Sequence, residues 1–242
     1  MIRLENLTKQ YGKLTAVDQL NLEIHEGELF ALLGVNGAGK TTTIKLLSCL
    51  SSPTSGTALV GGYDVTTDPI EVKRIIAVSP QQTAVAPNLN VRENLELICG
   101  VHGYSRKDAK DMTERVLEEF GLQEIAASRA KTLSGGWQRR LSIAMALISN
   151  PKVLFLDEPT LGLDVLARRE LWNAIRSLKG KVTIVLTTHY LEEAEALCDR
   201  IAIMSKGRLR ALGTVEQLKA QTETDSLEDA FLALNEKGGE AK

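Results

Sequence analysis

The chain has 242 residues, 43% of them hydrophobic, which is enough for one large domain or two small ones with a buried core. Its 31 Asp and Glu residues against 29 Lys and Arg leave a net charge of -2, which argues against a general affinity for nucleic acid or an anionic membrane. A charged N-terminus argues against a secretory signal, and no run of roughly eighteen apolar residues predicts a membrane span. The three cysteines are far apart in the sequence, so we expect reduced, mostly buried thiols in a cytosolic protein.

Strand and helix patterns alternate along most of the chain. Ile2 to Ile24 contains alternating segments such as LNLEI, which predict an antiparallel sheet. The strand-like runs that follow are mostly apolar throughout, as expected for strands covered on both faces. The sequence therefore predicts an α/β fold with a mostly parallel sheet and an N-terminal antiparallel β subdomain. The predicted strands of the main sheet are Leu29–Leu33, Ile75–Val78, Val153–Leu156, Val182–Thr187 and Ile201–Met204.

A helical segment interrupts this alternation. Between about Asn90 and Asn150 the strand signals stop and consecutive helical patterns appear. Ser105 and Ser134 stand at positions that cap two of these helices, and Gly121 stands where one should end. We therefore predict a helical subdomain, about residues 84–150, inserted in the α/β core.

The stretch GVNGAGKT, Gly34 to Thr41, follows a predicted strand and leads into a helical pattern. It matches a phosphate-binding loop of the P-loop type. The glycines let backbone amides ring a phosphate chain, the helix N-terminus adds positive charge, and Lys40 reaches the β- and γ-phosphates. Thr41 supplies a hydroxyl for magnesium. On its own, this loop would also suit kinases and GTPases.

A second candidate element is VLFLDEP, an apolar strand that ends in Asp157 and Glu158. Both acids are expected at the carboxyl end of the sheet, where ligands bind in open α/β folds. Asp157 is suited to hold magnesium. Because adjacent strand residues point in opposite directions, Glu158 is free to polarise the water that attacks the γ-phosphate.

A third element, LSGGWQRR, begins at Leu133. Ser134 and the two glycines after it predict another amide-rich helix start, which is a phosphate cradle without a lysine of its own. One cradle with a lysine and one without it suggest a composite site.

With these elements, the chain resembles the ATP-binding-cassette family over nearly its whole length, to about residue 218. GVNGAGKT resembles the Walker A loop, VLFLDE the Walker B strand and LSGGWQ the signature motif. SPQQ resembles the Q-loop, LGLD the D-loop and TTHY the switch-histidine segment, in the family's order. The sequence departs from the family at Val35, Trp137 and Leu161, none of which is a catalytic group. Trp137 is expected either to contact a nucleotide or partner or to pack beside its own helix.

The resemblance implies that two such domains meet head to tail, with each ATP between one chain's Walker A loop and the other chain's signature. ATP and Mg2+ are the implied cofactors, and Asp164 would communicate across the dimer. Tyr11 would stack on adenine, unless it is an ordinary surface aromatic. The nucleotide-binding residues that the resemblance implies are Tyr11, Gly34, Asn36, Gly37, Ala38, Gly39, Lys40, Thr41, Thr42, Ser134, Gly135, Gly136 and Asp164.

The catalytic residues implied by the resemblance are Glu158, His189 and Gln81. Glu158 would be the general base, and His189 would orient it and contact the γ-phosphate. Gln81, or Gln82 in its place, would contact magnesium and the attacking water. The implied magnesium ligands are Thr41, Gln81 and Asp157.

The segments GAGKTTTIKLL and TTHYLEEAEALCDRIAIMSKGRLRALGT look like the ATPase subunits of bacterial exporters of drugs and antibiotics. That resemblance implies a separate transmembrane permease subunit, a second copy of this chain or a paralogous ATPase subunit as partners, and no nucleic acid. The chain would then lie at the cytoplasmic face of the cell membrane, bound through the membrane subunit. Two alternatives stay open: a cassette ATPase of translation, DNA repair or cluster assembly without a membrane partner, and a P-loop small-molecule kinase.

The chain end is expected to follow the cassette domain, residues 1–218, as a separate segment, residues 219–242. Its stretch SLEDAFLALN predicts an amphipathic helix with Ser226 and Asp229 at capping-box spacing. The last stretch, NEKGGEAK, predicts a disordered tail. The apolar face of the predicted helix is formed by Leu227, Phe231 and Leu234.

Overall fold

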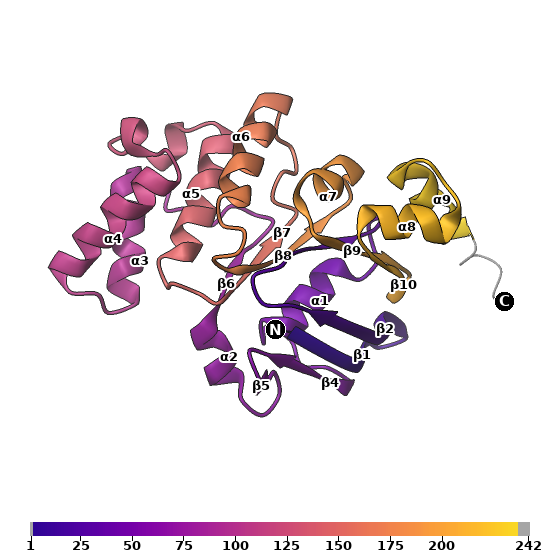
Figure 1. Ribbon diagram of the computed structural model, residues 1–242. Coiled ribbons are helices and arrows are strands. Elements are labelled where there is room, and N and C mark those ends of the chain that lie inside the picture. Colours follow the sequence, from indigo (N-terminus) through magenta and orange to yellow (C-terminus); the bar gives the residue numbers. More distant parts are fainter. Residues whose placement is uncertain (1, 237–242) are drawn as a thin grey trace.

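Two β-sheets and the helices packed on them make up the fold (Figure 1). The computed structural model describes residues 2–236. The smaller sheet is antiparallel, with the strand order β2-β1-β4-β5. It consists of β1 (Ile2–Tyr11), β2 (Leu14–Ile24), β4 (Ser55–Val60) and β5 (Tyr63–Asp64). The antiparallel arrangement predicted for the N-terminal segment is confirmed.

The larger sheet has the order β10-β9-β3-β8-β7-β6. All neighbouring strands pair in parallel except β10, which pairs antiparallel with β9. This confirms the predicted α/β fold with a mostly parallel sheet. Its strands are β3 (Leu29–Leu33), β6 (Ile76–Ser79), β7 (Val153–Asp157), β8 (Thr183–Thr188), β9 (Arg200–Ser205) and β10 (Arg208–Gly213).

The main sheet is buried on both faces, which explains its apolar strands. In β3, Leu29, Ala31 and Leu33 contribute to a core shared with the helices α3 to α7, whereas Phe30 and Leu32 contribute to a core shared with α1 and the antiparallel sheet. Side chains of successive strand residues point to opposite faces, so one short strand supplies both cores. The sheet is therefore a rigid middle layer that fixes the loops at its carboxyl end.

Two strands begin one residue later than predicted. Ile75 ends the helix α2 (Pro69–Ile75), so β6 begins only at Ile76. Val182 precedes β8, which begins at Thr183, where the amide of Thr183 bonds the carbonyl of Lys152. Ile75 and Val182 are β-branched and favour strand conformation as much as the strand residues that follow them. The first residue of each strand is therefore set by pairing with the neighbouring strand, which the local sequence does not show.

Helices fill the interval between β6 and β7. They are α3 (Val91–Val101), α4 (Arg106–Glu119) and α5 (Gly135–Leu147). Short 3-10 turns, at Gln123–Ile125 and Ala130–Thr132, connect α4 to α5. Figure 1 shows these helices gathered at one end of the molecule, as expected for an inserted helical subdomain.

The capping residues expected in this subdomain cap its helices. Ser105 accepts the amide hydrogen of Asp108, and Ser134 accepts that of Trp137. Gly121, in the left-handed region at φ 59°, follows the last turn of α4. These caps fix where each helix begins or ends, and for α5 they fix the position of the signature motif.

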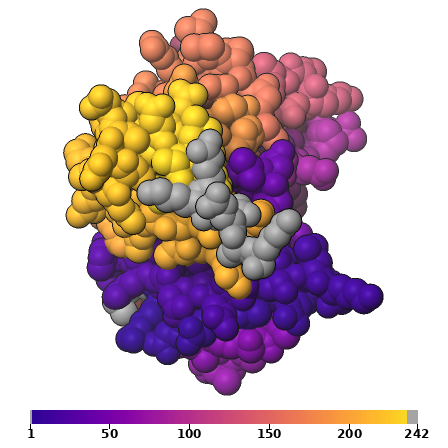
Figure 2. Space-filling model, turned by 90° about the vertical axis from the view of Figure 1, so that its right-hand side faces the viewer, coloured from indigo at the N-terminus to yellow at the C-terminus, as the bar shows by residue number. Residues whose placement is uncertain are grey.

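The remaining helices follow the strands of the main sheet. The C-terminal pair, α8 and α9, packs together beside β10, and Figure 2 shows these helices in yellow above the N-terminal strands in indigo. No helix within residues 2–236 is both long and apolar enough to cross a bilayer. These helices are α1 (Lys40–Leu47), α6 (Val165–Arg176), α7 (Leu191–Leu197), α8 (Val215–Thr222) and α9 (Leu227–Glu236).

The structure of the chain end agrees with the sequence only in part. The capping pair forms, because Ser226 accepts the amide hydrogen of Asp229, and Leu227 is buried in the core. The helix α8, with Leu218 fully buried, spans the expected boundary between residues 218 and 219. The first two residues of the predicted disordered tail lie in α9, and 237–242 lie outside the described residues.

Candidate functional site

A cavity of about 610 Å3 opens at the carboxyl end of the main sheet. Its walls come from the loop between β3 and α1, from residues that follow β6, β7, β8 and β9, and from the end of β1 and the first residues of β2. Residues that are remote in sequence, such as Tyr11, Lys40, Gln81 and His189, line this one cavity. Open parallel sheets bind ligands at this edge.

The loop between β3 and α1 is tied down by backbone hydrogen bonds at both ends. The amide of Gly34 donates to the carbonyl of Thr188 at 3.3 Å, and the carbonyl of Ala38 accepts from the amide of Gly207 at 3.1 Å. Gly37 and Gly39 adopt φ values of 82° and 100°, which turn the chain in a way that side chains disfavour. The predicted binding residues Asn36, Gly37, Ala38, Gly39 and Thr42 all line the cavity.

Two glycines in this loop have no room for a side chain. A Cβ at Gly34 would lie 2.4 Å from the carbonyl oxygen of Met204, and a Cβ at Gly39 would lie 2.4 Å from that of Ala16. The loop thus packs backbone against backbone, and its residues Asn36 to Gly39 line the cavity. This geometry fits a phosphate chain.

Lys40 lies at the first position of α1 with its ammonium group beside the loop. Its Nζ donates to the carbonyl oxygens of Gly34 at 2.7 Å and Val35 at 3.3 Å, and lies 3.3 Å from Oε1 of Glu158. The side chain is 5% exposed. A buried ammonium held in this way is a fixed positive charge next to the loop amides, suited to a polyanion.

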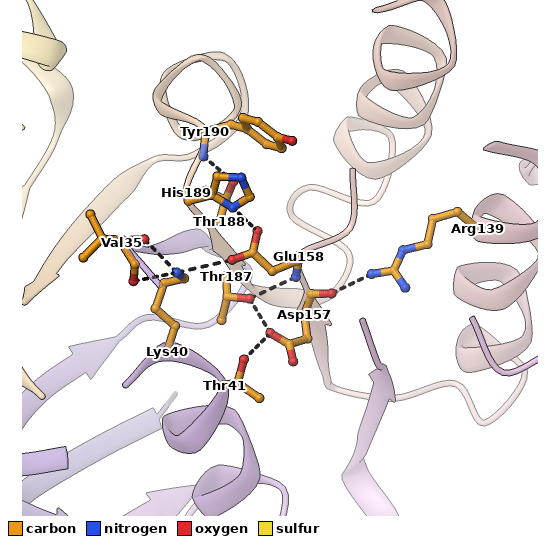
Figure 3. A network of polar contacts seen from close by, with 11 residues as sticks. Val35, Lys40, Thr41, Arg139, Asp157, Glu158, Thr187, Thr188, His189 and Tyr190 are labelled. Carbon is orange, nitrogen blue, oxygen red and sulfur yellow. Dashed lines mark hydrogen bonds and ion pairs between the residues drawn. The ribbon is translucent and has the colours of Figure 1, made fainter. Parts of the chain in front are cut away.

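Asp157, the last residue of β7, is held by two hydroxyl groups. Its Oδ1 accepts from Thr41 at 3.0 Å and from Thr187 at 2.6 Å (Figure 3). The Thr41 hydroxyl and the carboxylate are therefore adjacent at the edge of the cavity. Hard oxygen donors in this arrangement fit Mg2+, which is commonly bound by one or two carboxylates together with substrate phosphates.

Glu158 lies beyond the strand, with φ 48°. The expectation that it leaves on the opposite face by strand alternation is wrong, because β7 ends at Asp157 and a left-handed turn directs Glu158 into the cavity. The amide of Glu158 donates to both the carbonyl and the hydroxyl of Thr187, at 3.2 and 3.0 Å, and so holds this turn. Non-glycine residues in this backbone region cluster at functional sites.

The carboxylate of Glu158 lies between two basic groups. Oε1 faces Lys40, and Oε2 lies 2.7 Å from Nδ1 of His189 (Figure 3). The ring of Tyr190 lies 4.1 Å from that of His189, and its amide donates to Thr188. The His189 ring is thus held between Glu158 and Tyr190, and the buried Glu158 carboxylate has this imidazole as a fixed neighbour.

Gln81 and Tyr11 line the cavity, and both residues are exposed. Gln82 does not line it, which favours Gln81 of the two glutamines. Lys9 lies with Nζ 5.0 Å from the centroid of the Tyr11 ring. The positions of these residues allow the base of a nucleotide to contact Tyr11 while its phosphates lie on the loop between β3 and α1.

The predicted residues of the signature and the D-loop do not line this cavity. Ser134, Gly135 and Gly136 form the start of α5, where a Cβ at Gly136 would lie 2.9 Å from that of Ala167. Asp164 caps α6 by accepting the amide hydrogens of Leu166 and Ala167. Within this chain they are helix-start residues, and a phosphate-binding role for them requires a second chain.

Trp137 packs beside its own helix, because the guanidinium of Arg140 lies 4.4 Å from its ring centroid. Trp172, on α6, donates from Nε1 to the Oε1 atom of Glu193 at 3.1 Å. The cysteines within the described residues are free thiols, of which Cys99 is buried and Cys49 and Cys198 are half-buried.

Sequence reasoning missed Thr187, Arg139 and Glu193. Thr187 has a local signal, because a hydroxyl at the carboxyl end of a buried strand needs a partner. Arg139 and Glu193 resemble ordinary helix-surface charges in the sequence, yet both are buried, at 4% and 0% exposure. Burial raises the pKa of the Glu193 carboxyl above its usual value, the charge of Glu158 adds to this, and the hydrogen bond from Trp172 opposes it.

Comparison with known proteins decides the family. The sequence pattern of the ABC transporter family matches residues 17–161. The chain belongs to the ABC transporter family. The motifs Walker A, Walker B and signature therefore lie within a cassette of that family, and the cassette's fold agrees with the sheets and the helical subdomain described above.

ABC proteins similar to this chain differ in how much of their length the cassette represents. The human ATP-binding cassette sub-family A member 2 is 47% identical over 225 residues, which is 90% of this chain but 9% of that protein. The daunorubicin resistance ATP-binding protein DrrA3 of Streptomyces coeruleorubidus is 41% identical over 94% of this chain and 72% of its own. The solved dimeric ATP-binding cassette MJ0796, bound to ADP and Pi, is 28% identical, with a TM-score of 0.77 over 88% of this chain and 98% of that one.

Proposed function

We propose that this cassette binds and hydrolyses ATP as the nucleotide-binding subunit of a transporter that exports drugs, antibiotics or similar compounds, with no nucleic acid among its partners. The observation that carries the proposal is the cluster of Lys40, Glu158 and His189 at the mouth of a phosphate-binding loop. It combines a fixed cation for the phosphates with a buried carboxylate for the attacking water.

The chain's own residues supply the binding of ATP. The loop amides from Asn36 to Gly39 and the amide end of α1 face the phosphates, and Lys40 adds a charge that can follow the β- and γ-phosphate oxygens. Tyr11 is the stacking partner for the adenine. The cavity of about 610 Å3 has the size of a site for a drug-sized ligand.

Thr41, Asp157 and Gln81 are the residues that would hold Mg2+. Their hydroxyl, carboxylate and amide oxygens are the hard donors that this ion takes, and Thr41 and Asp157 lie 3.0 Å apart. When bound, Mg2+ neutralises charge on the β- and γ-phosphate oxygens. Thr187 keeps the Asp157 carboxylate pointed at this place by a second hydrogen bond.

In hydrolysis, Glu158 is the group that accepts the proton of the attacking water. The carboxylate accepts a proton from water as the water oxygen bonds to the γ-phosphorus, and the bond from that phosphorus to the β-γ bridging oxygen breaks to leave ADP. His189 holds Oε2 of Glu158 at 2.7 Å, so the other oxygen, Oε1, is directed to the side of Lys40. A buried base held in this way has little freedom to turn away from the water.

We infer that the functional unit holds two cassettes head to tail. Ser134, Gly135 and Gly136 lie outside the cavity of their own chain and form an amide-rich helix start, which suits the γ-phosphate of ATP on a partner. The solved MJ0796 cassette is described as dimeric. The partner is a second copy of this chain or a paralogous subunit. A separate transmembrane subunit carries the cargo and holds this chain at the cytoplasmic face of the membrane.

The test is a pulldown of the tagged chain from detergent-solubilised native membranes, with ATPase assays on the recovered complex. We expect a multi-span membrane protein to co-purify and activity to disappear in Glu158→Gln. The matched control is Glu170→Gln, which removes an exposed carboxylate that pairs with Arg140. Recovery of only ribosomal, DNA-repair or cluster-assembly proteins would contradict the transport part of the proposal and leave the ATPase part standing.

A further inference from the structure

Arg139 is a buried cation for which the mechanism above has no use. It lies in α5, and its side chain is 4% exposed. Figure 3 shows it on the side of Asp157 that faces away from Lys40. Arginine is almost never fully buried unless its donors are paired, so the partners of this side chain define what it does.

The partners are backbone carbonyls of two separate segments. Nη2 donates to the carbonyl of Asp157 at 2.7 Å, and Nε donates to that of Pro159 at 2.9 Å. Nη1 donates to the carbonyl of Pro80 and, at 3.4 Å, to that of Gln81. The planar guanidinium has its donors in a fixed fork, so one group sets the spacing between both segments.

The two segments carry the groups that face the γ-phosphate end of the cavity. Residues 80 and 81 follow β6, and residues 157 to 159 are the last residue of β7 and the two that follow it; β7 pairs with β6 in parallel. Within the described residues, the strand pairing between β6 and β7 ends at Ser79 and Leu156, and no backbone pairing joins the two segments beyond them. Arg139 bridges them at this point, so that the side chains of Gln81 and Glu158 line one cavity.

The same side chain connects these segments to the signature motif. Arg139 stands one turn after the start of α5, which begins at Ser134 and Gly135. A hydrogen bond between Ser79 and Ser142, at 3.2 Å, adds a second tie between this helix and β6. The signature end of α5 and the hydrolytic residues therefore belong to one rigid unit.

The charge of Arg139 strengthens these bonds. Burial lowers the pKa of its guanidinium to about 10, while the charges of Asp157, Glu193 and Glu158 oppose that shift. The group therefore stays a cation at neutral pH. Hydrogen bonds from a cation to carbonyls in a low-dielectric interior are stronger than neutral ones.

We propose that Arg139 is a positioning residue that holds Gln81 and Glu158 at a fixed separation and ties that separation to the signature end of α5. The proposal rests on the ATPase function proposed above. Its consequence is that the side chain acts on turnover and not on ATP affinity, because the phosphate loop and Tyr11 make no hydrogen bond with it within the described residues.

The test compares Arg139→Gln, Arg139→Lys and the neighbouring Arg140→Gln in the full chain. For Arg139→Gln we expect MgATP affinity within about twofold of wild type and kcat lower by about 10- to 100-fold. Hydrogen exchange should rise in residues 79–83 and 157–161 and stay unchanged in residues 34–43. Arg139→Lys keeps the charge without the fork and should give intermediate values in both assays.

Arg140→Gln is the matched control, because Arg140 pairs with the exposed Glu170 and stacks on Trp137 instead of contacting the strand ends. It should keep kcat within about twofold. The proposal would be overturned if Arg139→Gln folds and keeps the wild-type kcat and hydrogen exchange. It would also be overturned if the variant loses MgATP affinity and kcat to the same extent. If Arg139→Gln does not fold, Arg139→Lys tests the proposal by the same criteria. If wild type hydrolyses no ATP, the ATPase proposal fails, and the exchange pattern still decides whether Arg139 holds the two segments.

Discussion

Alanine in place of Gly39 tests whether the phosphate loop needs the backbone that the structure shows. Gly39 has φ 100°, and a Cβ there would lie 2.4 Å from the carbonyl oxygen of Ala16. Gly37 has φ 82°, but a Cβ there would meet nothing within 4 Å. Gly37→Ala therefore measures the cost of a positive φ alone, and Gly39→Ala adds the cost of the close contact with Ala16.

The conformation alone costs about 1–3 kcal/mol at either position. Overpacking adds about 1–3 kcal/mol at Gly39, because backbone must move to admit the methyl group. Since 1 kcal/mol corresponds to about 2–4 °C for a chain of roughly 150–250 residues, Gly39→Ala should melt about 2–12 °C below Gly37→Ala.

The assay is thermal unfolding of both variants without nucleotide, followed by titration with MgATP. We expect Gly39→Ala to bind MgATP more weakly than Gly37→Ala, because the shifted loop no longer presents its amides together. Equal melting temperatures for the two variants would refute the close approach between Gly39 and Ala16.

Three further predictions concern side chains around the cavity. Thr187→Val should lower the free energy of unfolding by about 1–3 kcal/mol in urea titrations, because it leaves a buried carboxylate without one of its donors. Since the pKa of Glu193 is raised above 4.5, wild type loses stability as pH rises from 4.5 to the folded-state pKa. Glu193→Gln has no carboxyl group at this position and so lacks that loss. In urea unfolding at several pH values, its free energy of unfolding should therefore rise relative to that of wild type by up to about 1.4 kcal/mol per pH unit in this window. A difference between the two proteins that stays constant with pH would contradict the effect of burial on Glu193. Tyr11→Ala should weaken ATP binding by about 1–3 kcal/mol in calorimetry, whereas the control Tyr63→Ala, outside the cavity, should not change it.

The parts of the site that lie in one short stretch were predictable from the sequence. The loop around Lys40 and the strand that ends in Asp157 each combine a strand, a turn and a ligand type within a few residues. The parallel sheet follows from runs that are apolar on both faces. Ser134 was predictable as a helix cap for the same local reason.

The parts that depend on contacts between distant segments were not predictable. The left-handed turn at Glu158 depends on Thr187, and the burial of Arg139 depends on carbonyls near Pro80. A single sequence gives neither the sign of φ at a glutamate nor the partners of an arginine on a helix. The domain boundary expected at residue 218 stays a prediction; the structure shows that Leu218 lies within α8 and is buried in the core.

The proposed mechanism makes Glu158 the general base of an ATPase whose two sites close between two cassettes. The most direct measurement combines size-exclusion chromatography with light scattering on Glu158→Gln in MgATP, with nucleotide analysis of the eluted protein. We expect a dimer that retains unhydrolysed ATP, because the amide can no longer accept the proton while the binding residues stay intact. A Glu158→Gln protein that elutes with ADP and hydrolyses ATP at the wild-type rate would show that Glu158 is not the general base.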